Sequence, residues 1–327
     1  MIITKTPYRI SFFGGGSDYP SWYLKNGGSV LSTTIDKHIY VSCRYLPPFF
    51  NHKYRIVWSH IEKVKDIKNI KHRAVKELLK YIKIKKGLEI HYDGDLPARS
   101  GMGSSSVFVV GLMNLLYNFK GRTISNKKLA IESINFEQKI LKETVGSQDQ
   151  IAAAYGGFNK ISFKTNGSFL VEPMSIKKNV IKNLNKNLIL LYTGYKRTAH
   201  NIAKTYVNKL EKDKRDSILE ISSFVDEATV SLKKNDLKSF GKLLHESWLL
   251  KKNLSKSITN YKINEIYDDA LRHGALGGKL LGAGGGGFFL FYVPYKYQKQ
   301  FIKYFNKLIN VPFKFSSKGS EIMLNNN

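Results

Sequence analysis

The sequence predicts a protein of two domains, each built from both helices and strands. Its 327 residues, 42% of them hydrophobic, lie between the length of one large domain and that of two ordinary ones. Strand-like alternation and helical periodicity occur in both halves of the chain, and a polar, basic stretch at 176–186 separates the halves. We therefore expect an N-terminal domain at 1–180 and a C-terminal domain at 181–327.

The N-terminal half opens with an alternating pattern that ends in glycines, which predicts a strand running into a tight loop. Ser17 to Trp22 then has the features of a helix start, because Asp18 lies near the positive end and Pro20 is tolerated in the first turn. The run 107–119 is apolar nearly all round, which predicts a helix buried on most sides. The strands expected in this half are 1–14, 28–45, 53–58, 88–92, 159–163 and 168–171, with another helix at 72–83.

A helix predicted at 127–143 carries a carboxylate on its apolar face. Ala130, Ile134 and Leu141 stack along one side of this helix, and Glu137 shares that side. Burying an unpartnered carboxylate costs several kcal/mol, so Glu137 should meet a cation, a metal or a hydrogen-bond cluster. A structural salt bridge explains this helix, taken alone, equally well.

The second half begins with an apolar strand and continues with helices. The strand is expected at 188–192. The chain ends with a strand, a helix and a strand. The helices expected are 198–209, 215–234, 237–255 and 263–273, and the final three elements are 288–292, 295–308 and 313–315.

The formal net charge of +28 and the pI near 9.8 would suit a nucleic-acid binder. The lysines are spread among Ile and Asn along the chain, however, and no zinc finger, basic zipper or RNA-binding sheet motif accompanies them. We interpret the charge as a compositional bias whose field helps to gather anions such as ATP and sugar phosphates, and we expect no nucleic-acid partner. An RNA-binding protein is the alternative, and it predicts strongly salt-dependent binding.

Other bulk features indicate a cytoplasmic protein without a membrane partner. No stretch approaches the roughly 18 apolar residues of a membrane span, and the N-terminus lacks the pattern of a signal peptide. Cys43, the single cysteine, has no partner for an intramolecular disulfide, so we expect a buried, inert thiol.

Three glycine-rich loops, at 13–18, 97–106 and 282–287, need a common explanation. The second follows a predicted strand and opens a predicted helix, so its amides and serines are suited to cradle phosphates near Mg²⁺. No Gly-x4-Gly-Lys-Ser/Thr motif occurs. The third loop matches Gly-x-Gly-x-x-Gly, but a helix is expected before it and a strand after it, the reverse of a dinucleotide site. We expect this loop to approach a ligand closely, with a plain structural turn as the alternative.

A second carboxylate, Asp149, follows the helix that carries Glu137. Two acidic residues near a phosphate cradle divide naturally into a metal ligand and a group that orients or deprotonates an attacking hydroxyl. An isolated Asp is more often a helix cap or a turn residue, so the assignment of Asp149 to a functional site depends on its neighbours.

The three loops, in this order, resemble the motifs of the GHMP kinases, the superfamily of galactokinase, homoserine kinase, mevalonate kinase and phosphomevalonate kinase. The phosphate loop departs from the family pattern only at Met102 and Ser106, which keep apolar and small character. The resemblance covers essentially the whole chain. It implies an α+β fold with a ribosomal-S5-like N-terminal domain, a ferredoxin-like C-terminal domain and the active site between them.

The resemblance also implies roles for individual residues. Asp149 matches the catalytic aspartate, and Arg9 matches the basic residue that holds it and stabilises the transferring phosphoryl group. Glu137 and Ser105 match the Mg²⁺ ligands. The ATP phosphates would lie on Gly101, Met102, Gly103, Ser104, Ser105 and Ser106, and the substrate on Gly15, Gly16, Ser17, Asp18, Gly284, Gly285 and Gly286.

Within the superfamily, the stretches 12–20 and 67–73 and the triple serine are most similar to the bacterial D-glycero-D-manno-heptose 7-phosphate 1-kinases. The implied product is the 1,7-bisphosphate used for nucleotide-activated heptose and surface polysaccharide. A phosphorylated substrate needs a second anion site, for which Lys196 and Arg197, or Arg99, are candidates, although a solvated basic loop explains them equally well. Another sugar 1-kinase of the galactose or fucose type, or a non-catalytic sensor on the same fold, is the alternative, and either a monomer or a homodimer is expected.

Overall fold

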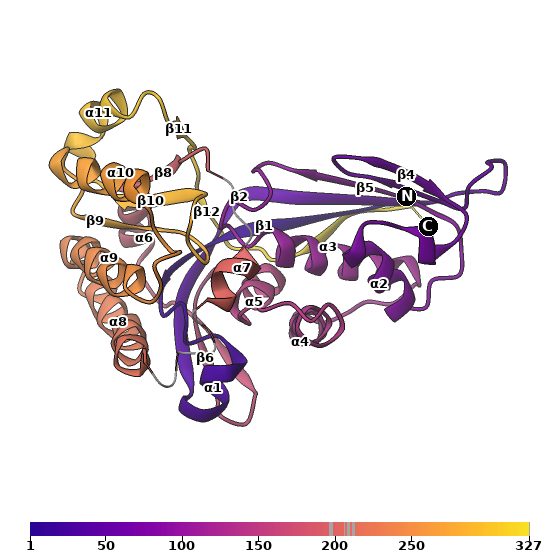
Figure 1. The fold of residues 1–327 in the computed structure, drawn as a ribbon, viewed down its shortest axis with the longest axis horizontal. Coiled ribbons are helices and arrows are strands. Elements are labelled where there is room, and N and C mark those ends of the chain that lie inside the picture. The colour runs from indigo at the N-terminus through magenta and orange to yellow at the C-terminus, as the bar shows by residue number, and fades with distance from the viewer. Residues whose placement is uncertain (196–198, 206, 208–209, 211–212, 327) are drawn as a thin grey trace.

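The structure, a computed structural model, contains two sheets joined by a continuous chain (Figure 1). It describes residues 1–195, 199–205, 207, 210 and 213–326. The first sheet has nine strands, of which six follow the order β13-β1-β2-β5-β3-β4. In addition, β12 and β6 pair with β2, and β7 pairs with β6. Its strands are β1 (Ile2–Phe13), β2 (Gly28–Tyr45), β3 (Tyr54–Val57), β4 (Ile61–Val64), β5 (Leu88–Gly94), β6 (Phe158–Phe163), β7 (Phe169–Pro173), β12 (Phe315–Ser316) and β13 (Glu321–Asn325).

Strand β2 organises the first sheet because its two ends have different neighbours. Gly28 to Thr33 pairs with β6, whereas Ile39 to Tyr45 pairs with β5. β1 pairs with β2 on its other edge, with register irregularities on either side of the Arg9–Thr34 pair. Arg9 therefore pairs with β2 close to the point where the partner of β2 changes from β6 to β5. This part of the sheet lies next to the second domain.

Helices cover one face of the first sheet (Figure 1). The central helix, α3 (Ser104–Phe119), is buried from Ser106 to Leu116, as its apolar sequence predicts. Its N-terminal end lies at the junction with the second domain, where it follows the second glycine-rich loop. The other helices of this part are α1 (Pro20–Asn26), α2 (Arg73–Tyr81), α4 (Asn126–Asn135) and α5 (Gln148–Tyr155), with a 3-10 turn, η1, at Ile67–Asn69.

The second sheet is antiparallel and has the order β11-β8-β10-β9. Phe289 and Phe291 of its central strand contact Trp248, Tyr267 and Phe301. Three helices therefore pack on one face of this sheet. Its elements are α6 (Lys178–Lys186), β8 (Leu188–Tyr192), α7 (Ala199–Lys204), α8 (Arg215–Lys233), α9 (Leu237–Lys252), α10 (Tyr261–Arg272), β9 (Gly277–Leu280), β10 (Phe288–Tyr292), α11 (Tyr295–Tyr304) and β11 (Ile309–Asn310).

Several expectations were wrong in detail. The polar stretch 176–186 contains helix α6, because Val180 and Leu184 form a buried stripe at helical spacing. The segment before the third glycine-rich loop is strand β9 and not a helix. The two glycines of β9 weaken the signal of a strand in the sequence. Packing nevertheless requires a glycine at 277, because a Cβ there would lie 2.2 Å from the carbonyl oxygen of Gly241.

The carboxylate-bearing helix also differs from its prediction. It continues from α4 into a π-helical turn, η2 (Phe136–Ile140), and ends there rather than at 143. Asp18 precedes α1 but does not cap it; the N-cap is Tyr19. Cys43 is buried, and burial raises the pKa of its thiol. No described helix is long and apolar enough to cross a membrane.

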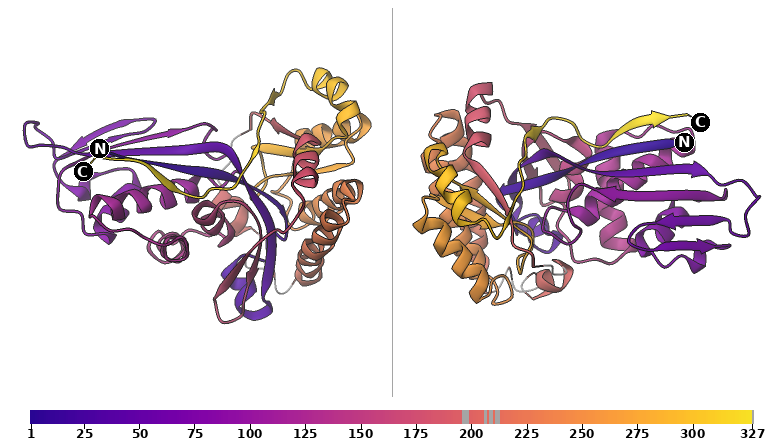
Figure 2. Two further views of the ribbon diagram at one scale, coloured as in Figure 1. Left: turned by 180° about the vertical axis from the view of Figure 1, so that it is seen from behind. Right: turned by 90° about the horizontal axis from the view of Figure 1, so that it is seen from above.

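The C-terminal tail returns to the first sheet. β12 pairs with β2, and β13 pairs with β1 from Ile2 to Lys5, so the two termini lie close together (Figure 2). Residues 315–325 therefore belong with the first sheet by pairing, although the expected C-terminal domain included them. A boundary near residue 180 stays a prediction.

Candidate active site

The candidate site lies at the junction of the two sheets, where the second glycine-rich loop leads into α3. Arg99, Gly101 and Gly103 have positive φ angles of 61°, 84° and 75°, so the loop is a tight turn. Gly103 is the N-cap of α3 and provides no side-chain cap. The first amides of this 16-residue helix are therefore left for another acceptor, and its dipole favours an anion there.

Arg9 and Asp149 form a two-pronged ion pair beside this loop. Arg9 Nε donates to Asp149 Oδ1 at 2.7 Å, and Nη2 donates to Oδ2 at 2.9 Å. Nη1 donates to the carbonyl oxygen of Gly101 at 2.8 Å. Arg9 is 3% exposed, whereas 22% of the Asp149 side chain is accessible. One guanidinium thus orients the carboxylate and fixes it to the loop.

The loop and the carboxylate are in close contact. A Cβ on Gly103 would lie 3.0 Å from Asp149 Oδ2, so this backbone can approach the carboxylate only without a side chain. Asp149 lies in the first turn of α5, close to the open end of α3. The structure therefore brings the predicted phosphate loop, Arg9 and Asp149 together.

Glu137 is completely buried below the same helix end. Its Oε2 accepts from Gln150 Nε2, which also donates to Ser106 Oγ, whereas Oε1 has no partner among the described residues. Burial is the main cause that raises the pKa of Glu137 to about 8, and the polar groups of Ser106 and Gln150 beside it oppose this shift. A buried carboxylate oxygen without a partner fits a cation, since Mg²⁺ commonly binds one or two carboxylates together with substrate phosphates.

The serines of the loop differ in their surroundings. Ser106 hydrogen-bonds in the Glu137 cluster, whereas Ser105 is exposed at the helix end. Ser105 as a Mg²⁺ ligand stays a prediction. The described residues contain no group of three or more acidic, His or Cys side chains suited to a metal.

Asp18 lies close to the arginine–aspartate pair but is almost closed off. It is 2% exposed, and its Oδ1 accepts from the amide of Gly16 at 3.0 Å. Burial, and then the charge of Asp149, raises the pKa of Asp18. A Cβ on Gly146 would lie 1.8 Å from Asp18 Oδ2, so this glycine makes room for the carboxylate. The role of the loop 15–18 in binding a sugar stays a prediction.

The third glycine-rich loop packs against the chain itself. Cβ atoms on Gly282, Gly284, Gly286 and Gly287 would lie 2.1–2.8 Å from the backbones of Gly101, Ile258, Tyr195 and Ser100 respectively. The amide of Phe288 also donates to the carbonyl oxygen of Ser100 at 3.1 Å. These contacts account for glycines 282, 284, 286 and 287 without a ligand, and they join the second domain to the phosphate loop. A substrate role for 284–286 stays a prediction.

Replacing Gly287 by Ala should separate these two loops. We expect a loss of about 3 kcal/mol in the free energy of unfolding, because the new Cβ would meet the carbonyl oxygen of Ser100 at 2.1 Å. Gly121→Ala is the matched control, since Gly121 also has a positive φ, but no atom of the described chain lies within 4 Å of the position that its Cβ would take. Denaturant unfolding of both variants measures the difference, and equal losses would show that the contact is unimportant.

Of the three candidates for a second anion site, Arg99 lies in the described part of the chain. Lys196 and Arg197 lie outside the described residues. Arg99 is exposed on the rim of the phosphate loop, and its amide donates to Ser104 Oγ at 3.2 Å.

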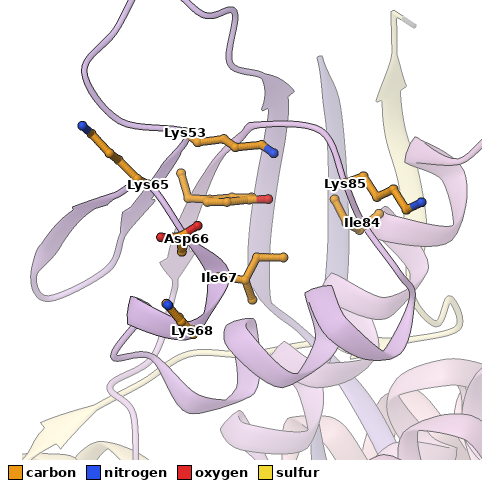
Figure 3. A pocket seen from close by; sticks show the side chains of 8 residues that line it. Lys53, Lys65, Asp66, Ile67, Lys68, Ile84 and Lys85 are labelled. Atoms are coloured by element: carbon orange, nitrogen blue, oxygen red, sulfur yellow. The ribbon is translucent and has the colours of Figure 1, made fainter.

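A separate basic hollow of about 580 Å³ lies beside β3, β4 and η1 (Figure 3). Lys53, Lys65, Lys68 and Lys85 line it with Tyr54. None of the glycine-rich loops contributes to it, so it is not part of the candidate active site.

Three residues that support this site carry no clear signal in the sequence: Gln150, Lys279 and Lys251. Gln150 joins Glu137 to Ser106, but its only signal is its position next to Asp149 on α5. Lys279 stands out in the sequence only by its place shortly before the third glycine-rich loop, yet its ammonium donates to the carbonyl oxygen of Phe12 in the first domain. Lys251 has no signal beyond its place in a predicted helix.

Comparison with known proteins agrees with this geometry. A family model described as "GHMP kinases N terminal domain" matches residues 69–157, and "GHMP kinases C terminal" matches 228–307. The chain is 29% identical over 310 residues to D-glycero-alpha-D-manno-heptose 7-phosphate kinase from Campylobacter jejuni, covering 89% of each chain. It is 24% identical over 318 residues to galactokinase from Pyrococcus furiosus, covering 88% of this chain and 87% of that one.

Solved structures share the fold. A D-glycero-D-manno-heptose 1-phosphate kinase from Bacteroides thetaiotaomicron superposes with a TM-score of 0.80 at 22% identity over 100% of both chains. The mevalonate kinase of Methanococcus jannaschii gives 0.72 at 24% identity over 96% of this chain and 98% of that one. The two family models describe one family and together match more than half of the chain. The protein therefore belongs to the GHMP kinases, with their two-domain mixed fold, and is an ATP-dependent phosphotransferase.

Proposed function

We propose that this sugar kinase phosphorylates the anomeric hydroxyl of D-glycero-D-manno-heptose 7-phosphate and forms the 1,7-bisphosphate. The observation that carries the proposal is the ion pair of Arg9 with Asp149, held against the phosphate loop at Gly101. This arrangement puts a partly accessible carboxylate next to the place where the terminal phosphate of ATP would lie.

In the proposed reaction, the anomeric oxygen attacks the γ-phosphorus of ATP. A bond forms between these two atoms, the bond from the γ-phosphorus to the bridging oxygen breaks, and ADP leaves with the electron pair. Asp149 orients the hydroxyl and takes its proton. The amides of the phosphate loop and the guanidinium of Arg9 stabilise the charge that spreads over the transferring group.

Glu137 is the first of the two proposed metal ligands, and Ser105 is the second. The unpartnered Oε1 of Glu137 and the neighbouring Ser106 hydroxyl fit a small hard cation better than they fit a packed core. When bound, Mg²⁺ supplies charge neutralisation between the terminal phosphates of ATP. Gln150 holds the carboxylate in place through Oε2, so Oε1 would be the oxygen that binds a cation.

The choice of heptose 7-phosphate is supported by the C. jejuni relative, whose name gives this substrate. A bifunctional fucokinase/GDP-fucose pyrophosphorylase of Arabidopsis thaliana is 27% identical over 312 residues, which cover 29% of that protein. This similarity keeps a fucose-type sugar as the second candidate. Both candidates use the same phosphate loop and Asp149, so the substrate pocket alone separates them.

Coupled ADP release tests the proposal, with ATP, Mg²⁺ and a panel of heptose 7-phosphate, heptose, mannose, galactose, fucose and mevalonate. We expect kcat/KM for heptose 7-phosphate to exceed that for heptose by about 10²-fold, because a paired phosphate adds charge-assisted hydrogen bonds. Activity on fucose or another neutral sugar alone would refute the phosphorylated substrate. An absence of turnover on every sugar would favour the non-catalytic sensor.

A further inference from the structure

Two lysines that the proposed mechanism does not use lie between the domains. Lys279 of β9 is 4% exposed, and its ammonium donates to the carbonyl oxygen of Phe12 at 2.6 Å. Phe12 lies near the end of β1, the strand that carries Arg9 and runs from the N-terminus to the second domain (Figure 1). This hydrogen bond therefore joins the second sheet to the strand of the proposed catalytic arginine.

Lys251 supports the third glycine-rich loop from helix α9. Its ammonium donates to the carbonyl oxygens of Leu280 and Gly282 at 2.7 and 2.6 Å. Gly282 packs directly on Gly101, whose carbonyl oxygen accepts from Arg9. Contacts thus run without a break from Lys251 through two glycine loops to the guanidinium that holds Asp149.

The setting of these ammonium groups is electrostatically unfavourable. All three of their hydrogen bonds in the described part of the chain go to main-chain carbonyls. Burial, and then the charge of Arg9, lowers the pKa of Lys279 to about 7, and Asp18 opposes this. Burial, and then Lys279 and Arg9, also lowers the pKa of Lys251, again opposed by Asp18. Apolar side chains would fill such positions at lower cost, so stability does not explain the two cations.

We propose that Lys279 and Lys251 are positioning residues for phosphoryl transfer, which in their protonated form hold β1 and the third glycine-rich loop in register with the phosphate loop. The inference rests on the proposed kinase function and adds a dependence of turnover on two cations that need not touch nucleotide or sugar. A displacement of about 1 Å in such supporting contacts can lower the rate about 10²-fold.

Lys279→Met and Lys251→Met test the inference by separating turnover from stability. Methionine has a similar length and no charge, so the melting temperature should stay the same or rise. We expect kcat to fall about 10²-fold, with the KM for MgATP changed less than about threefold. Lys242→Met, at an exposed position of the same helix α9, is the control and should keep full activity.

The pH dependence of kcat in Lys279→Arg separates the effect of the charge at this position from the effect of packing. The groups facing Lys279 are Arg9 from β1, Asp18 from the loop after it and Lys251 from α9. At saturating MgATP, kcat of the wild-type protein should decline as pH rises above about 7, because Lys279 loses its proton. Arginine stays protonated, so the variant should keep a constant kcat between about pH 7 and 9. If kcat of the Arg variant declined with pH as it does in the wild type, the decline would belong to another group. That result would overturn the role of Lys279.

Wild-type turnover in the same assay keeps the two proposals apart. If the wild type is inactive on every sugar, the proposed function fails, and hydrogen exchange then tests the lysines alone. Their loss should speed amide exchange at 99–104 and 280–287 in the nucleotide-free protein, whereas Lys242→Met should not. If the wild type is active and both methionine variants match it in kcat, only the positioning role is refuted.

Discussion

Replacing Asp149 by Asn is expected to lower kcat about 10³-fold while the KM for MgATP changes little. The amide cannot accept the proton of the attacking hydroxyl, and its NH₂ group would face a guanidinium nitrogen of Arg9 in place of one carboxylate oxygen. Rate and orientation are therefore lost together. Steady-state kinetics with ATP, Mg²⁺ and the preferred sugar measures the effect.

Two comparisons make this result interpretable. Asp226→Asn removes an exposed carboxylate, 70% accessible and paired with Lys160, and should leave kcat unchanged. Circular dichroism at the assay temperature shows whether the Asp149 variant is folded, because a buried arginine that loses its partner destabilises the protein. Turnover within tenfold of the wild type would mean that Asp149 is not the base.

Much of the candidate site could be predicted because its parts are local in sequence. The phosphate loop combines a strand, glycines and a helix start within about ten residues, and each of these leaves a signal in composition. Glu137 was predictable for another reason, since a carboxylate on an apolar helix face needs a partner wherever the helix packs. The structure confirms the burial of Glu137, and it shows a hydrogen bond from Gln150 that the sequence did not indicate.

What could not be predicted depends on contacts between distant segments. Lys279 and Phe12 are far apart in the sequence, and neither residue type indicates that an ammonium will cross between domains. The glycines of the third loop suggested a ligand, because sequence alone cannot distinguish close approach to a substrate from close approach to another backbone. β9 was missed for a related reason: its glycines are required by packing but weaken the pattern of a strand.

Replacing Glu137 by Gln is expected to lower kcat/KM about 10²–10³-fold and to weaken the dependence of the rate on Mg²⁺. Metal binding needs the ionised carboxylate, yet burial raises the pKa of Glu137 to about 8 in the metal-free protein. The apparent Mg²⁺ affinity of the wild type should therefore increase as pH rises from about 6.5 to 8.5. In the Gln variant it should be independent of pH, and an unaltered Mg²⁺ dependence would exclude Glu137 as the ligand.

The raised pKa of Glu137 also makes the stability of the metal-free protein depend on pH. Stability should fall as pH rises, whereas the affinity for Mg²⁺ should increase. Between the ordinary value of 4.5 and about 8, the folded metal-free protein keeps a proton on Glu137 that the unfolded chain has lost. The wild type should therefore lose stability, by a few kcal/mol, as pH rises through this range, whereas the Gln variant should not. At pH 8, saturating Mg²⁺ and nucleotide should stabilise the wild type more than the variant, because only the carboxylate gains a partner for its second oxygen. Thermal melts at about pH 5 and 8, with and without MgADP, measure both effects, and equal pH dependence in the two proteins would place the raised pKa on another group.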